Sequence, residues 1–222
     1  MGAPYDIVTF DCYGTLVDWQ GGISAAFMEA AAEDGVRLLR EEILTAHAEI
    51  EPRVQAEGFR TYRDVLTETA RRMALGFGWA IDHPRARFLP ESLPGWKIFD
   101  DTNAALQRLR DAGCRLGILS NVDDDLLCAT MRQFDCGFEL IVTAQQVRSY
   151  KPAETHFLTA RETIGEDRWL HAAQSWFHDV VPATRLGIPT AWINRTRETM
   201  PGDAKPEHEL TDLAGLAERL CS

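Results

Sequence analysis

Short apolar runs alternate along this sequence with longer segments whose apolar residues recur at helical spacing. Such runs, bounded by polar residues, Gly or Pro, are typical of buried strands. The predicted strands are residues 5–10, 115–119, 138–142, 169–173 and 190–193. The predicted helices that accompany them are residues 101–112, 124–134, 153–164 and 181–186. Strands that alternate with helices of this length predict an α/β fold with a doubly wound, Rossmann-like parallel sheet.

The 80 residues numbered 17–96, between the first and second predicted strands, do not alternate in this way. Three helices are predicted there, at residues 24–34, 41–57 and 62–77. Ile43 and Ile50 belong to an apolar stripe on one of them, and packing within a helical subdomain is the simplest explanation of that stripe. We therefore predict a core domain of residues 1–16 and 97–222, and a helical cap domain of residues 17–96 that acts as a lid over the strand ends.

Composition limits the classes of ligand and macromolecule that we expect the chain to bind. The chain has 222 residues and a net charge of −11. A basic surface for nucleic acid is not expected, and an anionic substrate would need a local cluster of cations. The five cysteines show no metal-ligand spacing, so we interpret them as reduced thiols. The first ten residues lack the basic flank and the long apolar run that are typical of a signal peptide, and no segment approaches the length of a membrane span, so we expect neither. We expect a cytoplasmic protein that binds neither nucleic acid nor membranes.

Chemically active side chains follow the first four of the predicted strands. They are a carboxylate (Asp11), a hydroxyl and an amide (Ser120 and Asn121), an ammonium group (Lys151) and a second carboxylate (Asp179). In an open α/β sheet, ligands bind beyond the carboxyl ends of the strands, where the strand order reverses. We therefore expect these five side chains to converge on one site.

Four motifs resemble the haloacid dehalogenase superfamily, and within it the L-2-haloacid dehalogenase group. They are DCYGT at 11–15, ILSN at 118–121, YKPAE at 150–154 and HD at 178–179. The resemblance covers nearly the whole chain and implies a doubly wound core with a helical cap inserted after the first strand. That implied architecture agrees with the alternation of strands and helices described above.

The resemblance also implies roles for residues of these motifs. Asp11 is the nucleophile, Thr15 supports its loop and Lys151 pairs with Asp11. Asp179 is the acidic residue of the last motif.

Substrate binding is implied for a second set of residues. Ser120 and Asn121 hold the anionic group of the substrate, and Tyr13 lines the site. The residue at position 13 is informative because family phosphatases carry a second Asp there, which protonates the departing alkoxide. A halide departs without a proton, so a tyrosine at this position favours carbon–halogen cleavage over phosphate ester hydrolysis.

The sequence departs from the dehalogenase pattern at two places. Those enzymes carry an Arg near the start of the first cap helix; Arg40 is the nearest candidate to bind substrate here, although a solvated helix residue is its simpler interpretation. Before the last acidic residue they carry Ser and Asn, whereas this chain has Ser175 and Trp176. His178 either replaces the lost amide as a base for water or only packs beside Asp179, and Ser175 is open to the same two interpretations.

Three functions are compatible with these residues. The first is a hydrolase without a cofactor that cleaves the carbon–halogen bond of a small 2-haloacid, an anionic organic acid, through an aspartyl ester on Asp11. The second is a phosphatase acting on a small phosphate ester, with Mg²⁺ held by Asp11 and Asp179. The third is a binding or regulatory protein on the same scaffold. The resemblance also allows a homodimer, which no apolar stripe in the sequence requires.

Overall fold

The computed structural model describes residues 3–221, which divide into two compact units. The first unit comprises the chain up to Val17, then Ile98–Asn121, and the remainder from Arg132. The second comprises Asp18–Lys97 and Val122–Met131. No helix among the described residues is long and apolar enough to cross a bilayer.

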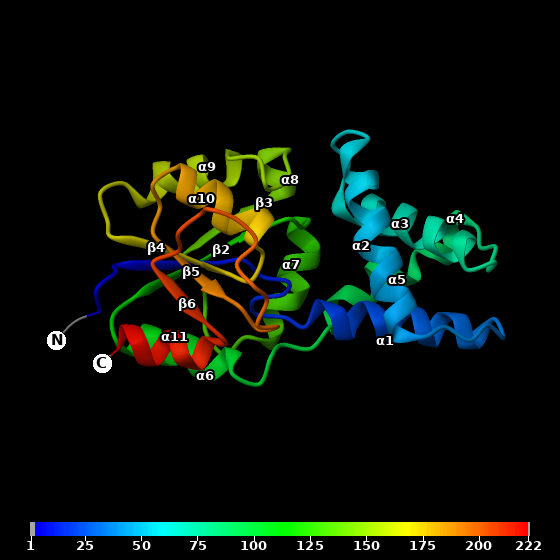
Figure 1. The fold of residues 1–222 in the computed structure, drawn as a ribbon, viewed down its shortest axis with the longest axis horizontal. Helices are drawn as coiled ribbons and strands as arrows, with labels where there is room; N and C mark the ends of the chain where they lie inside the picture. The colour runs from blue at the N-terminus through cyan, green and yellow to red at the C-terminus, as the bar shows by residue number, and fades with distance from the viewer. Residues whose placement is uncertain (1–2, 222) are drawn as a thin grey trace. The chain divides into compact units, whose positions relative to one another are not determined.

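A six-stranded parallel sheet forms the centre of the first unit, with the strand order β3-β2-β1-β4-β5-β6 (Figure 1). The strands are β1 (Ile7–Phe10), β2 (Arg115–Ser120), β3 (Leu140–Thr143), β4 (Trp169–Ala173), β5 (Thr190–Ile193) and β6 (His208–Leu210). The chain runs outwards from β1 in both directions, so the order reverses between β1 and β4. This order confirms the predicted doubly wound sheet and places the expected ligand-binding edge at the carboxyl ends of β1 and β4.

Helices cover both faces of the sheet, with α8, α9 and α10 on one face and α6 and α11 on the other (Figure 1). Their bounds are α6 (Thr102–Asp111), α8 (Ala144–Val147), α9 (Thr155–Ile164), α10 (Val181–Arg185) and α11 (Leu213–Leu220). The predicted helices at 101–112, 153–164 and 181–186 are confirmed as α6, α9 and α10. A π-helix, Trp176–Val180, leads from β4 into α10 and carries the last sequence motif.

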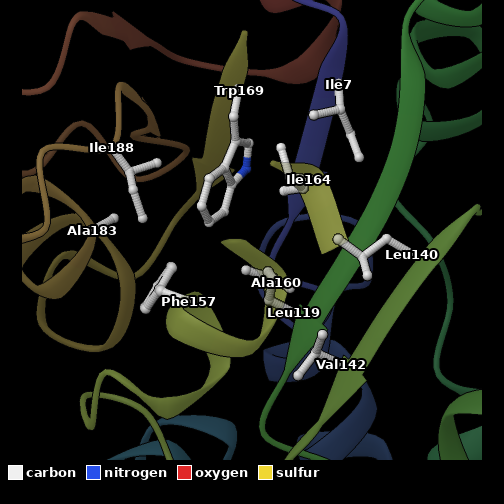
Figure 2. Close-up of a cluster of buried hydrophobic side chains, with 10 residues drawn as sticks. All are labelled: Ile7, Leu119, Leu140, Val142, Phe157, Ala160, Ile164, Trp169, Ala183 and Ile188. Carbon is white, nitrogen blue, oxygen red and sulfur yellow. The ribbon is translucent and has the colours of Figure 1, made fainter. Parts of the chain in front are cut away.

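Apolar side chains from the sheet and from α9 and α10 pack together in a buried cluster (Figure 2). Phe157 of α9 is fully buried, and its ring meets the ring of His171 edge to face, with 5.1 Å between centroids. Burying a side chain of this size contributes about 1.5–3 kcal/mol. This packing fixes β4 against α9 and thereby fixes the strand end that carries the last motif.

The second unit is helical. It contains α1 (Trp19–Glu33), α2 (Arg40–Ala56), α3 (Tyr62–Gly76), α4 (His83–Ala86), α5 (Phe88–Ser92), a 3₁₀ turn (Leu93–Gly95) and α7 (Asp124–Thr130). The helices predicted at 24–34, 41–57 and 62–77 are confirmed as α1, α2 and α3. The first begins five residues earlier than predicted because Asp18 caps it, accepting a 2.9 Å hydrogen bond from the backbone N–H of Gly21. Gly22 is required in this first turn, since a Cβ there would overlap the indole of Trp96.

The segment Val122–Met131 follows β2 in sequence but packs with the helical unit. The carboxylate of Asp123 accepts hydrogen bonds from the backbone N–H groups of Tyr62, at 2.8 Å, and Arg63, at 2.9 Å. These N–H groups open α3 and have no partner inside that helix, so Asp123 caps α3 from a distant part of the chain. The helix predicted at 124–134 is shorter in the structure, where α7 ends at Thr130 and a short 3₁₀ turn, Met131–Gln133, follows it.

Candidate active site

Three charged residues meet at the carboxyl ends of the sheet strands. The ammonium Nζ of Lys151 lies 3.0 Å from Oδ1 of Asp11 and 2.5 Å from Oδ1 of Asp179, and it also donates to the carbonyl of Leu119 at 2.7 Å. Asp11 directly follows β1, and Asp179 lies in the π-helix after β4. These are the adjacent strands at which the order reverses, so the structure brings the predicted nucleophile, lysine and last acidic residue together at the expected edge.

All three groups are buried, with exposed fractions of 1% for Lys151, 1% for Asp179 and 7% for Asp11. Burial tends to lower the pKa of Lys151, but the two carboxylates outweigh it and the pKa is raised. Burial tends to raise the pKa of Asp179, but Lys151 and His171 outweigh it and hold that pKa at about 2. For Asp11, burial dominates and raises the pKa, with the attraction to Lys151 opposing it. One ammonium thus serves two carboxylates, and Asp11 is the less stabilised of the two anions.

A tight loop after β1 presents Asp11. The backbone N–H groups of Leu16 and Val17 both donate to the carbonyl of Cys12, and Gly14 has a φ of 107°, which side-chain-bearing residues rarely adopt. The hydroxyl of Thr15 donates to Oδ2 of Asp11 at 3.1 Å.

Other contacts attach this loop to its neighbours. The backbone N–H of Gln174, after β4, donates to the hydroxyl of Thr15 at 2.9 Å. Arg195, which sequence reasoning missed, donates to the Thr15 carbonyl at 2.8 Å and is paired with Asp101. Thr15 therefore links Asp11, the predicted nucleophile, to the loop after β4, and its supporting role in the reaction stays a prediction.

Ser120 is the last residue of β2 and Asn121 follows it, but the two side chains differ in their hydrogen bonding. The side chain of Asn121 accepts from the backbone N–H of Lys151 at 2.7 Å and donates to the carbonyl of Lys151 at 3.0 Å. This reciprocal pair holds the backbone of the lysine in place. The hydroxyl of Ser120 is buried and has no hydrogen-bond partner among the described residues. Ser120 therefore has a donor available for an anionic group, whereas Asn121 positions Lys151; binding of substrate by either stays a prediction.

Ser175 and His178 bond to each other at the start of the π-helix. The hydroxyl of Ser175 lies 3.0 Å from Nδ1 of His178 and accepts from the backbone N–H of His178 at 3.1 Å. Burial lowers the pKa of His178, so its ring is neutral near pH 7. Trp176, at the place of the expected amide, packs against Trp192 with 4.9 Å between ring centroids. The structure therefore supports an orienting bond for His178, while its role as a base stays a prediction.

Tyr13 and Arg40 are the other two predicted substrate-binding residues. Tyr13 is half-buried in the loop that carries Asp11, and it forms a bridge with Val17. Arg40 lies in the helical unit as the exposed first residue of α2, and its guanidinium reaches the carbonyl of Gln20 at 3.5 Å. Contact of either residue with a substrate stays a prediction.

A chain of polar side chains inside the sheet was missed by sequence reasoning. Nε2 of His171 lies 3.0 Å from Oδ1 of Asp179, and Nδ1 of His171 lies 2.8 Å from the hydroxyl of Thr9. That hydroxyl accepts a 2.7 Å hydrogen bond from the indole N–H of Trp169. The sequence did contain one indication of this chain, namely a Thr and a His inside otherwise apolar strands. In the structure, Thr9 and His171 are register partners in β1 and β4.

The described residues contain no group of three or more His, Cys, Asp or Glu side chains arranged to hold a metal ion. Asp11 and Asp179 are the two carboxylates at the sheet edge. Mg²⁺ in proteins is usually bound by one or two carboxylates, and water and phosphate oxygens complete its coordination. The residues present therefore fit the limited protein contribution that a magnesium site needs, and Asp11 and Asp179 are the residues that would hold the ion.

Curated relatives of the whole chain share its length. The chain is 27% identical to (S)-2-haloacid dehalogenase H-109 of Pseudomonas putida, with 98% of each chain covered. It is 26% identical to an (S)-2-haloacid dehalogenase of Pseudomonas fluorescens, over 95% of this chain and 94% of the relative.

Solved structures with the same fold span nearly the whole chain. The defluorinating L-2-haloacid dehalogenase Rha0230 matches with a TM-score of 0.82 at 22% identity, covering 100% of this chain and 99% of that chain. The L-2-haloacid dehalogenase of Xanthobacter autotrophicus with chloropropionic acid covalently bound gives 0.80 at 19% identity, covering 96% and 97%. The HAD-hydrolase YfnB of Bacillus subtilis bound to magnesium gives 0.83 at 18% identity, covering 97% and 98%.

A family model described as haloacid dehalogenase-like hydrolase matches residues 5–173, which is more than half of the chain. The match includes the loop that carries Asp11, the end of β2, Lys151 and the whole of β4. It confirms the resemblance that the sequence motifs carried. The chain belongs to the haloacid dehalogenase-like hydrolases and is an enzyme of that family.

Proposed function

We propose that this enzyme cleaves the carbon–halogen bond of a small 2-haloacid by hydrolysis, with Asp11 as the nucleophile and without a cofactor. The observation that carries the proposal is a buried carboxylate bound by Lys151 and Thr15, with Tyr13 rather than a carboxylic acid two residues further on. The names of the full-length relatives support the same reaction class.

In the first step, a carboxylate oxygen of Asp11 attacks the carbon that bears the halogen. The new C–O bond forms as the carbon–halogen bond breaks, and its electron pair leaves with the halide, giving an aspartyl ester. Two anions must approach each other, because the substrate also carries a carboxylate. At an effective dielectric constant near 20, two unit charges 4 Å apart repel by about 4 kcal/mol. Lys151 offsets this repulsion, and the buried hydroxyl of Ser120 is the donor that we assign to the substrate carboxylate.

In the second step, water attacks the carbonyl carbon of the Asp11 ester. A base takes one proton from the water, the ester C–O bond breaks with its electron pair going to the alkoxide oxygen, and that proton is passed to this oxygen to give the 2-hydroxy acid. The second proton of the water is lost from the new carboxyl group, which is thereby regenerated as a carboxylate that contains one oxygen from water. Asp179 and His178 are the two candidates to accept the proton. We assign the orientation of the water to Asp179, because it is ionised and lies at the same edge as Asp11.

The leaving group decides between this reaction and phosphate ester hydrolysis. An alkoxide needs a proton as it departs, and loss of the donor at position 13 costs on the order of a hundredfold or more in rate. A halide needs none. The alternative activity is a Mg²⁺-dependent phosphatase in which Asp11 and Asp179 hold the metal. That possibility is favoured only by their two carboxylates at one sheet edge.

The location that we propose is the cytoplasm. All five cysteines are free thiols in the structure, as expected in a reducing compartment.

Four substrates separate these activities: chloroacetate, 2-chloropropionate, fluoroacetate and p-nitrophenyl phosphate, each with and without EDTA. We expect halide release that EDTA does not abolish. Magnesium-dependent phosphate release without halide release would instead establish the phosphatase.

The Asp11→Asn variant tests the nucleophile. We expect it to release no halide, whereas Asp203→Asn, an exposed aspartate changed in the same way, should match the wild-type enzyme. Full activity of Asp11→Asn would remove Asp11 from its assigned role.

A further inference from the structure

His171 occupies the middle of β4, where an apolar side chain is expected, and it is fully buried. Both of its ring nitrogens have partners, Thr9 on one side at 2.8 Å and Asp179 on the other at 3.0 Å. Phe157 closes one side of the ring. A buried imidazole bonded at both nitrogens cannot turn without breaking a hydrogen bond, so its orientation is fixed.

The direction of these hydrogen bonds follows from groups that can only donate or only accept. The indole of Trp169 can only donate, so the hydroxyl oxygen of Thr9 is the acceptor of that bond. Asp179 is paired with the ammonium of Lys151 at 2.5 Å, so it is a carboxylate and only accepts. Nε2 of His171 must therefore carry a hydrogen.

The hydrogen of the Thr9 hydroxyl then determines the state of Nδ1. The two bonds to Trp169 and His171 are the only side-chain bonds of Thr9 among the described residues. If Nδ1 also carried a hydrogen, the Thr9 hydrogen would have no acceptor, and a buried unpaired donor costs about 1–3 kcal/mol. A bare Nδ1 accepts that hydrogen instead. The bonds thus run in one direction, from Trp169 through Thr9 and His171 to Asp179.

We propose that His171, as a neutral ring with its hydrogen on Nε2, is a positioning residue that orients Asp179 and through it Lys151 and Asp11. His171 and Lys151 both bind Oδ1 of Asp179, which fixes the rotation of that carboxylate. Both of these hydrogen bonds go to Oδ1, and Oδ2 is therefore the oxygen that we assign to water. The kinetic part of this inference rests on the proposed function, whereas its structural part does not.

Three variants and one control test the role in activity. His171→Leu removes both hydrogen bonds at similar volume and should lower kcat for halide release on the order of tenfold to a hundredfold with little change in KM. His171→Gln keeps one donor and one acceptor and should recover most of kcat. Thr9→Val removes the hydroxyl and should lower kcat less than His171→Leu. His208→Gln changes a partly exposed histidine outside the site in the same way, and should match the wild-type enzyme.

Nitrogen-15 NMR of the folded enzyme tests the tautomer independently of activity. The chain has six histidines, and the signals lost in His171→Gln identify those of His171. We expect one nitrogen that carries a hydrogen and one bare nitrogen, with the signal of the bare nitrogen changing in Thr9→Val.

The following results would overturn the inference: two protonated ring nitrogens, a kcat of His171→Leu equal to that of the wild-type enzyme, or no recovery in His171→Gln. If His171→Leu does not fold, His171→Gln and Thr9→Val still provide the comparison. If the wild-type enzyme releases no halide, the proposed function fails, and the tautomer of His171 alone then supports or overturns this inference.

Discussion

Replacing Lys151 with Met removes the one ammonium that serves two buried carboxylates while keeping a side chain of similar length. At an effective dielectric constant near 20, charges at 3.0 Å and 2.5 Å attract by about 6 kcal/mol each. Most of that attraction offsets the cost of burying three charged groups, each of which loses several kcal/mol of hydration. Removing one partner from such a buried set typically costs 3–5 kcal/mol, because the remaining charges lose their compensation.

We therefore expect Lys151→Met to lower the free energy of unfolding by about 3–5 kcal/mol near pH 7. For a chain of this length that corresponds to a fall in Tm of about 6–20 °C. Thermal and urea denaturation followed by circular dichroism measure this, with Lys205→Met as the control, since Lys205 is exposed. A loss no larger than that of the control would refute the idea that Lys151 neutralises the two carboxylates.

The same variant has a pH dependence of known sign. The pKa of Asp179 is about 2 in the folded protein against an ordinary value of 3.8, so its ionisation contributes about 2 kcal/mol that is fully present above pH 3.8. This contribution is lost as pH falls from 3.8 towards 2. The stability difference between the wild-type protein and Lys151→Met should therefore shrink as the solution is acidified through that range. A difference that grows on acidification would contradict the assignment.

Two further predictions concern Asp11, the proposed nucleophile. Burial raises the pKa of Asp11, and only its carboxylate can attack, so halide release should fall with decreasing pH at a midpoint above the ordinary pKa of 3.8. A profile of kcat/KM against pH measures this midpoint. A midpoint at or below pH 3.8 in folded enzyme would contradict the prediction. Thr15→Val removes the hydroxyl that donates to Oδ2 of Asp11 and accepts from Gln174, so kcat should fall roughly tenfold, since one hydrogen bond to a charged group is worth about 1.5 kcal/mol or more. An unchanged kcat in Thr15→Val would show that Asp11 is held without it.

The fold was largely predictable because burial on both faces makes the strands of a parallel sheet read as apolar runs. The strands β4 and β5 were predicted with the bounds that the structure has. The edge strand β6 was missed, since its sequence HEL is short, polar and only partly buried. The helix α11 was also missed, although Asp212 caps it and Leu213 and Leu216 give it a buried face.

The candidate site was predictable only where a polar side chain follows the end of a predicted strand. Asp11, Lys151 and Asp179 were found in this way, and the structure brings them together. His171 and Thr9 lie within strands, where the sequence shows only which residues are present and not that the two are register partners. The hydrogen bonds of Asn121 to the backbone of Lys151 also could not be predicted from the sequence, because the two residues are 30 positions apart.

The cap that Asp123 provides for α3 has a consequence for attempts to simplify this chain. A truncated enzyme in which a short linker replaces residues 18–97 would remove Tyr62 and Arg63, the backbone partners of that carboxylate. It would also uncover the apolar side chains of Leu126 and Leu127, which are buried in α7. The inserted helices and the segment 122–131 therefore form one structural unit. Grafting the insertion onto another sheet would require that segment to be transferred as well.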